Sequence, residues 1–167
     1  PGTFTVSCAG NPVGSNTIDY LVVAGGAGGG ADRGGGGGAG GYRESSGAAS
    51  GCYSISPLGS GVSALPVTAT GYPVTVGGGG AGGTPSCRVG NSGSNSVFTA
   101  SSTITSSGGG GGGSINNVVA VAGGSGGGQT SQYNPGLGPV GGAGNTPPVS
   151  PPQGNTGGKG FDGLAIS

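Results

Sequence analysis

The sequence predicts an all-β fold in which a β-sandwich packs against a bundle of polyglycine-II helices. Three observations predict it: short β-branched apolar runs, glycine tracts that alternate with them, and the absence of any apolar pattern with a helical period. A length of 167 residues suits one domain. We therefore expect residues 1–167 to form a single glycine-rich unit.

The predicted strands are short and recur along the whole chain. Residues 3–6 (TFTV) alternate, and residues 17–24 (TIDYLVVA) end in the continuous apolar run that is typical of a buried strand. Short strands separated by glycines favour antiparallel pairing in a sandwich, and Phe4, Tyr20 and Phe98 are expected in its core. Further candidate strands are residues 42–45, 52–56, 63–68, 72–76, 96–99, 103–106, 117–122 and 163–166.

Glycine dominates the rest of the chain, with 49 Gly beside 12 Pro. The absence of a strict G-X-Y repeat excludes collagen. Disorder usually combines low hydrophobicity with high net charge, whereas the eight charged residues cancel and 31% of the chain is apolar. Flexible linkers usually mix Ser with Gly, but the longest blocks here are almost pure Gly and Ala. The tracts cover residues 25–41, 77–83, 108–113 and 123–128, with a sparser series at 136–160.

A polyglycine-II arrangement would order such tracts. This helix has three residues per turn and no internal hydrogen bonds, so neighbouring helices without side chains can approach and bond to each other's backbone. Ordering Gly costs about 0.5–1 kcal/mol more than ordering Ala, while each bond between helices returns about 1 kcal/mol. The bundle should therefore be extensive or absent.

Residues 129–156 form a Pro/Gly-rich segment that cannot be a central strand. Two interpretations stay open: a flexible loop, or extended segments that join the glycine bundle and expose polar turns. Tyr133 in this segment is either a contact residue or a ring lying over glycine backbone.

The stretch IDYLVVAGGAGGG at residues 18–30 is similar to a dinucleotide-binding turn, and Gly26, Gly28 and Ala31 satisfy G-x-G-x-x-A. That motif needs a helix after the turn, and GGGADRGGGGGAGG cannot form a stable one. Residues 157–160 (GGKG) lack the first Gly and the Ser or Thr of a P-loop. No His is present to activate a serine, and the four carboxylates are scattered. We expect no enzyme, no cofactor and no metal site.

Charge and cysteine content exclude further classes. Arg33, Arg43, Arg88 and Lys159 form no run in the sequence, so we expect no nucleic-acid partner, and no apolar stretch approaches the length of a membrane span. The absence of Met suggests a processed piece, or the ordered part, of a longer chain. The three cysteines allow one disulfide, Cys52 with Cys87, or three buried thiols.

The order of the motifs GTFTV, NTIDYLVVAGGAGGG, GGGGGAGGYRE, YPVTVGGGGAGG, NSVF and ITSSGGGGGG resembles the glycine-rich domain of bacteriophage tail-fibre and tail-tip proteins. The composition is also similar to the polyglycine-II adhesins of T-even-like phages, whose connecting loops touch the host surface. It is similar as well to the glycine-rich region of anaplastic lymphoma kinase, which couples a jelly-roll sandwich to glycine helices. These resemblances imply a jelly-roll-like β-sandwich and a rigid extracellular scaffold without catalysis.

The function we expect is that of a virion tail-fibre module whose loops bind a host cell-surface polysaccharide or outer-membrane protein. The candidate receptor contacts are Gln129, Gln132, Tyr133 and Asn134, with Arg43 and Arg88 as further candidates. We expect other tail-fibre subunits as partners, in a homotrimer or as one adhesin that caps a trimer, and no membrane insertion. The alternative is a purely structural module of a fibre or extracellular filament, without a receptor of its own.

Overall fold

The computed structural model describes residues 1–11, 16–47, 56, 61–115, 118–130 and 140–160. In this part of the chain the regular elements are strands, and all their pairings are antiparallel, which confirms the predicted all-β class. The strands are β1 (Gly2–Thr5), β2 (Thr17–Ile18), β3 (Leu21–Val23), β4 (Tyr42–Glu44), β5 (Leu65–Pro66), β6 (Gly71–Thr75), β7 (Ser96–Thr99) and β8 (Thr103–Ser106).

The largest sheet has four strands in the order β1-β6-β7-β8, and two smaller sheets pair β2 with β5 and β3 with β4. Alternation along the large sheet gives it two different faces. Phe4 lies opposite Tyr72, and Phe98 lies opposite Ile104, on the face that is packed. Threonines such as Thr3 and Thr105 occupy the other face, where a β-branched polar side chain suits a solvated sheet.

The hydrophobic core is small and lies between the large sheet and β3, which contacts β7 and β8. Tyr72 and Phe98 are buried in this core together with Val22 of β3. The Phe4 ring lies 6.5 Å from that of Tyr72 and 6.4 Å from that of Phe98, yet its side chain is 44% exposed. The second layer therefore covers the β1 side of the large sheet incompletely.

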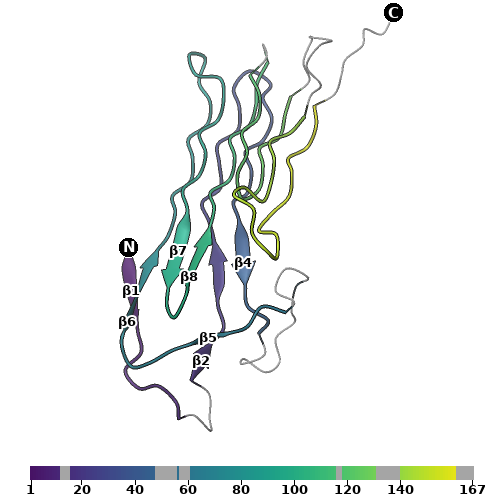
Figure 1. Ribbon diagram of the computed structural model, residues 1–167. Coiled ribbons are helices and arrows are strands. Elements are labelled where there is room, and N and C mark those ends of the chain that lie inside the picture. Colours follow the sequence, from purple (N-terminus) through teal and green to yellow (C-terminus); the bar gives the residue numbers. More distant parts are fainter. Residues whose placement is uncertain (12–15, 48–55, 57–60, 116–117, 131–139, 161–167) are drawn as a thin grey trace, which may run out of the picture.

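Two hairpins begin in the sheets and continue beyond them as glycine arms (Figure 1). β3 and β4 lead into residues 24–31 and 34–41, and β6 and β7 lead into residues 77–83 and 88–95. Leu21 lies opposite Glu44 in the sheet, and nearer the turn the Gly30 amide donates to the Gly35 carbonyl at 2.9 Å. In each pair the two residues are the same number of positions away from the turn, so the arms keep the register of the strands.

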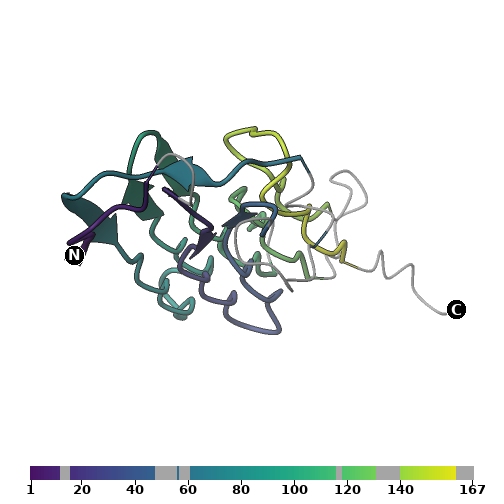
Figure 2. The same cartoon turned by 90° about the horizontal axis from the view of Figure 1, so that it is seen from below.

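Hydrogen bonds between the arms recur every third residue. Along residues 24–31, the amides of residues 24, 27 and 30 donate to tract 34–41, while those of 25, 28 and 31 donate to tract 88–95. A strand would instead repeat every second residue. A backbone with a three-residue repeat offers successive amides to different neighbours, so the tracts pack as a bundle and lie side by side when viewed along their length (Figure 2). We call the tracts 24–31, 34–41, 77–83, 88–95, 107–113, 123–130, 140–145 and 153–160 the glycine bundle.

Tract 107–113, which follows β8, is the centre of the glycine bundle. It bonds to tracts 24–31, 34–41, 88–95 and 123–130, and every residue from 106 to 114 is buried. At each glycine from 108 to 113, an added Cβ would fall within 3.0 Å of a neighbouring atom. In the edge tract 77–83 this holds only at residues 77, 80 and 83, and Ala81 is accommodated there. The purest glycine run is therefore the most enclosed one.

The described parts of the Pro/Gly-rich segment join the bundle. This agrees with the second of the two interpretations, in which extended segments join the glycine bundle. The Gly142 amide donates to Gly127 at 2.8 Å and the Gly157 amide to Gly142 at 2.9 Å. The strand predicted at residues 117–122 is wrong over its described part, where Val118 forms a single bridge to Ser114. This segment instead bonds to a glycine tract, with Val121 donating to Gly111 at 2.9 Å. The strand predicted at 163–166, and residues 52–55 of the strand predicted at 52–56, lie outside the described residues.

Candidate functional site

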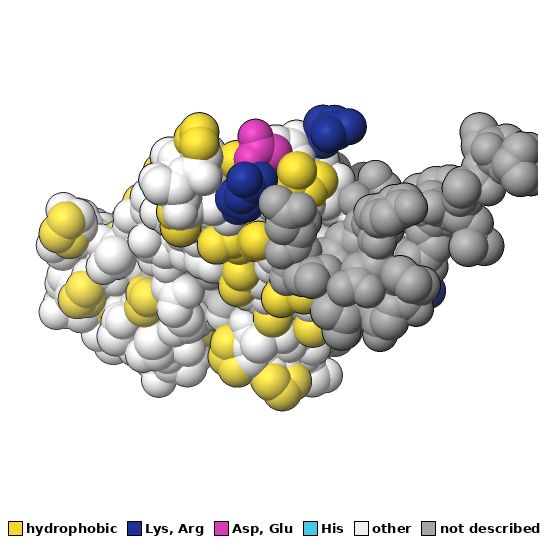
Figure 3. Space-filling view, turned by 90° about the horizontal axis from the view of Figure 1, so that it is seen from above, with side chains coloured by type: hydrophobic (Ala, Val, Ile, Leu, Met, Phe, Trp, Pro, Cys, Tyr) yellow, Lys and Arg dark blue, Asp and Glu magenta, His cyan; other side chains and the backbone are white. Residues whose placement is uncertain are grey.

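The turns that connect the glycine tracts gather at the end of the bundle farthest from the sheets. We call this region the distal end; among the described residues it comprises residues 31–34, 84–88, 114–115 and 130. Tract-to-tract bonds bring these turns together, since Ala31 donates to Arg88 at 2.8 Å and Gly35 to Gly113 at 2.9 Å. Figure 3 looks onto this end and shows acidic and basic side chains next to each other among polar and apolar ones.

Asp32 and Arg33 form the turn between tracts 24–31 and 34–41 with φ angles of 50° and 59°. This left-handed region suits glycine; Asp enters it more readily than most residues, whereas it costs a long side chain such as Arg33 about 1–2 kcal/mol. The chain carries glycine at 49 positions, yet it has a carboxylate and a guanidinium at these two. Side chains kept at a backbone cost are a feature of functional sites.

Neighbouring tracts hold this turn in place. The Arg88 guanidinium pairs with the Asp32 carboxylate, and these side chains are 33% and 40% exposed. The Thr130 hydroxyl donates to the carbonyl of Arg33, and the Ser114 hydroxyl donates to that of Ala31. Three separate tracts therefore fix the positions of the charged groups, although the ion pair itself adds only about 0.2–1 kcal/mol at this exposure.

A second turn at the distal end joins tracts 77–83 and 88–95. The amide of Thr84 donates to the carbonyl of Cys87 at 2.7 Å, and the Cys87 amide donates back to Thr84 at 3.1 Å. The hydroxyls of Thr84 and Ser86 lie 3.2 Å apart. Together with the Asp32–Arg33 turn, this loop presents short hydrogen-bonding side chains on a backbone that is bonded at both ends.

The structure separates the receptor contacts predicted from the sequence. Arg88 is at the distal end, whereas Arg43 lies half-buried in β4 within the sheets. Gln129 is not exposed as expected: it is only 7% exposed, its Oε1 accepts from the Ala120 amide at 2.7 Å and its Nε2 donates to the Val118 carbonyl at 3.2 Å. Gln132, Tyr133 and Asn134 lie outside the described residues.

The buried Gln129 side chain bonds to the neighbouring segment through both of its polar atoms, because a side-chain amide supplies both an acceptor and a donor. Gln153 does the same at the sheet end and is 1% exposed. Its Oε1 accepts from the Ser107 amide at 2.8 Å, and its Nε2 donates to the Pro147 carbonyl at 3.0 Å. Sequence reasoning missed this role, because a Gln in a Pro-rich stretch is typical of an exposed loop.

Two of the three cysteines lie in the described residues. Cys8 and Cys87 carry free, exposed thiols, which is at odds with the alternative of three buried thiols. Cys52, the expected partner of Cys87, lies outside the described residues.

The ionisable residues of the sheet end are occupied in packing. Asp19 accepts from the Ser45 hydroxyl at 2.6 Å and from the Gly47 amide at 3.1 Å. Burial raises the pKa of Tyr20 above its ordinary value of 10.0, and the nearby Arg43 guanidinium opposes this in part. The described residues contain no group of three or more His, Cys, Asp or Glu side chains placed to hold a metal ion.

A family model described as a glycine-rich domain matches residues 1–166. The chain belongs to this glycine-rich domain family. Searches of curated proteins and of solved structures gave no match. The family match spans the sheets and the glycine bundle together, so the distal end is part of the glycine-rich domain itself. Over the described part of the domain, no helix has the length and apolarity needed to cross a bilayer.

Proposed function

We propose that this glycine-rich domain is a bacteriophage tail-fibre or tail-tip module, whose distal end binds a polysaccharide or an outer-membrane protein on the host cell. In this view the sheets form a jelly-roll-like sandwich at the base, and the glycine tracts are polyglycine-II helices that carry the turns outward. The module is extracellular, as part of the virion, and joins other fibre subunits in a trimer. We assign it no catalytic step and no cofactor.

The three-residue repeat of the hydrogen bonds supports the polyglycine-II assignment, because that helix has three residues per turn. Its rise of about 3.1 Å per residue is close to the roughly 3.3 Å of a strand. Both arms of the hairpin have the same rise, so the register of β3–β4 continues unchanged through tracts 24–31 and 34–41.

The observation that carries the binding hypothesis is the pair Asp32 and Arg33 at positive φ. A purely structural turn in a chain so rich in glycine would be served better by glycine. A rigid support for these side chains also reduces the entropy that is lost when a receptor binds.

The experiment is a binding titration of the fluorescently labelled domain on a panel of bacterial strains. We expect saturable binding to at least one strain, and a loss of at least tenfold in affinity in the variant Asp32→Gly with Arg33→Gly. The matched control is Ser101→Ala, an exposed position in the β7–β8 hairpin in the sheets. If an intact fibre binds a strain and the isolated domain does not, the domain is the purely structural module of the alternative hypothesis.

A further inference from the structure

The β3 strand has one open edge. Ala24 donates to Gly41 at 3.0 Å and Ser45 donates to Tyr20 at 3.0 Å, so the backbone groups of the even-numbered residues in this segment face β4. Those of Leu21 and Val23 face the opposite way, as alternation in a strand requires. In the part of the chain that the structure describes, no backbone partner is seen for them. This edge can accept another strand.

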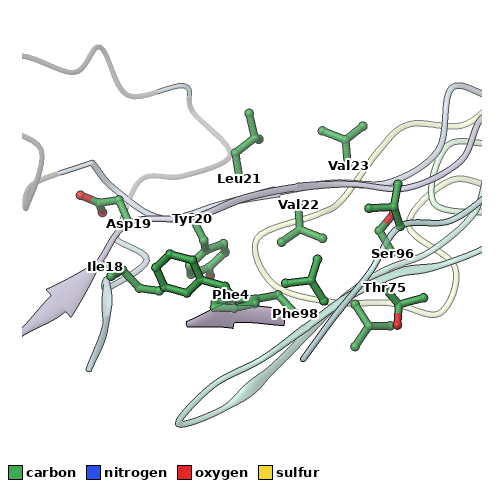
Figure 4. Close-up of a pocket in the computed structure, with 13 residues that line it drawn as sticks. Phe4, Ile18, Asp19, Tyr20, Leu21, Val22, Val23, Thr75, Ser96 and Phe98 are labelled. Atoms are coloured by element: carbon green, nitrogen blue, oxygen red, sulfur yellow. The ribbon is translucent and has the colours of Figure 1, made fainter. Parts of the chain in front are cut away.

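An apolar groove of about 440 Å³ runs between this open edge and the large sheet (Figure 4). Its floor includes Phe4 and Phe98, and Tyr20 and Val22 approach it from the β3 side. Val74 is also part of its lining. The groove has room for about fifteen water molecules at roughly 30 Å³ each. Phe4 at 44% exposed and Val76 at 77% exposed show how much apolar surface remains uncovered. One more strand beside β3 would complete the second layer over β1 and β6.

We propose that this groove binds the C-terminal segment of a second copy, residues 161–167 (FDGLAIS), as an added strand. Leu164 and Ile166 alternate, so both side chains of an extended segment enter the groove while its backbone bonds to Leu21 and Val23. The segment contains no proline, and every residue can therefore donate to the ladder.

The occupant comes from a second copy because the same chain cannot reach. The Gln129 amide donates to the Gly158 carbonyl at 3.0 Å and the Gly113 amide to the Gly128 carbonyl at 2.9 Å, so the last described tract ends near the distal end. The return to the sheets along tract 107–113 takes about 19 Å at 3.1 Å per residue. Seven extended residues span at most about 25 Å, which leaves too little length to cross the bundle and lie along β3.

A contact of this kind is head-to-tail, because the groove of one copy receives the C-terminal segment of the next. Such contacts produce a filament, or a ring if the rotation closes. The docked segment leaves from the distal end, so in a filament only the last copy presents its distal end to a receptor; the association itself is measured without a receptor and can fail or hold independently of receptor binding.

Sedimentation velocity of the full chain from 1 to 200 μM tests the proposal. We expect concentration-dependent association, lost in Leu164→Asp with Ile166→Asp and also in the groove variant Val76→Asp. The matched control Val140→Asp is 60% exposed on a glycine tract and should associate as the wild type does. A monomeric wild type would overturn the proposal, as would association that survives the double C-terminal substitution or falls equally in Val76→Asp and Val140→Asp.

A second measurement identifies the docked edge. In the associated wild type, the amide hydrogens of Leu21 and Val23 should exchange at least tenfold more slowly than in the double C-terminal variant. A labelled FDGLAIS peptide added to that variant should bind and restore the protection, and a peptide with Asp at the Leu and Ile positions should not. Unchanged exchange at Leu21 and Val23 in an associated sample would place the contact elsewhere and overturn the proposal.

Discussion

Adding one methyl group at Gly111 should destabilise the domain strongly, because this residue lies at the centre of the glycine bundle. The Cβ of Gly111→Ala would lie well within 3.0 Å of the Gly90 carbonyl, whereas ordinary contact begins at 3.4 Å. Tract 88–95 would have to move away by more than an ångström. The bonds at risk run from Gly90 to Gly112 and from Gly93 to Gly109, both 3.0 Å long.

Each buried bond that is broken without replacement costs about 1–3 kcal/mol. Two such bonds cost about 2–6 kcal/mol, and the lower entropy of unfolded Ala returns about 0.4–1 kcal/mol. We therefore expect Gly111→Ala to lower the free energy of unfolding by about 1–6 kcal/mol, a substantial fraction of the 5–15 kcal/mol typical of a domain. Guanidinium denaturation followed by tyrosine fluorescence, together with calorimetry, measures this loss.

The matched control is Gly36→Ala on the outer surface of the bundle. A Cβ there meets nothing within 4 Å, and the residue is exposed. This substitution should leave stability unchanged or raise it by about 0.4–1 kcal/mol. Equal effects of the two substitutions, within about 0.5 kcal/mol, would refute the packed bundle.

Three further predictions concern single features of the domain. Asp32→Gly with Arg33→Gly should change the free energy of unfolding by less than about 1 kcal/mol, because relief of the positive φ offsets the lost ion pair and the added chain entropy; denaturation of this variant beside the wild type checks it. Gln153→Ala should cost about 1–3 kcal/mol, since it leaves the buried Ser107 amide without its acceptor; the control Thr156→Ala, at an exposed position of the same tract, should change stability by less than about 0.5 kcal/mol. Because the pKa of Tyr20 is raised in the folded state, its neutral form is favoured and stability should fall as pH rises above about 10; the fall should be smaller in Tyr20→Phe, and equal pH profiles would contradict the assignment.

The sequence predicted the structure best where a residue type suits only one kind of structure. The β-branched runs around Phe98 and Ile104 predicted β7 and β8 at their observed bounds. The hexaglycine run at 108–113 is also the tract that tolerates no Cβ at any position. In both cases packing demands a composition that few other structures would require.

The sequence was least informative where a side chain forms the hydrogen bonds that backbone groups form elsewhere in the bundle. Gln129 and Gln153 were expected in an exposed segment, yet each supplies an acceptor and a donor to a neighbouring segment. The positive φ of Asp32 and Arg33 could not be foreseen either, because the surrounding glycines hide where the chain turns. Composition predicts the bundle, but the pairing of its tracts depends on contacts between residues far apart in the chain.

Amide hydrogen exchange along the glycine tracts tests the central claim, that the glycines form an ordered bundle held by bonds between tracts. In the central tract, the amides of residues 109, 110, 112 and 113 should exchange as slowly as those of β8. In the edge tract 77–83, Gly80 and Gly83 donate at 2.8 Å and should be protected, whereas the exposed Gly79 and Gly82 should exchange fast. Random-coil exchange rates throughout both tracts would contradict the claim.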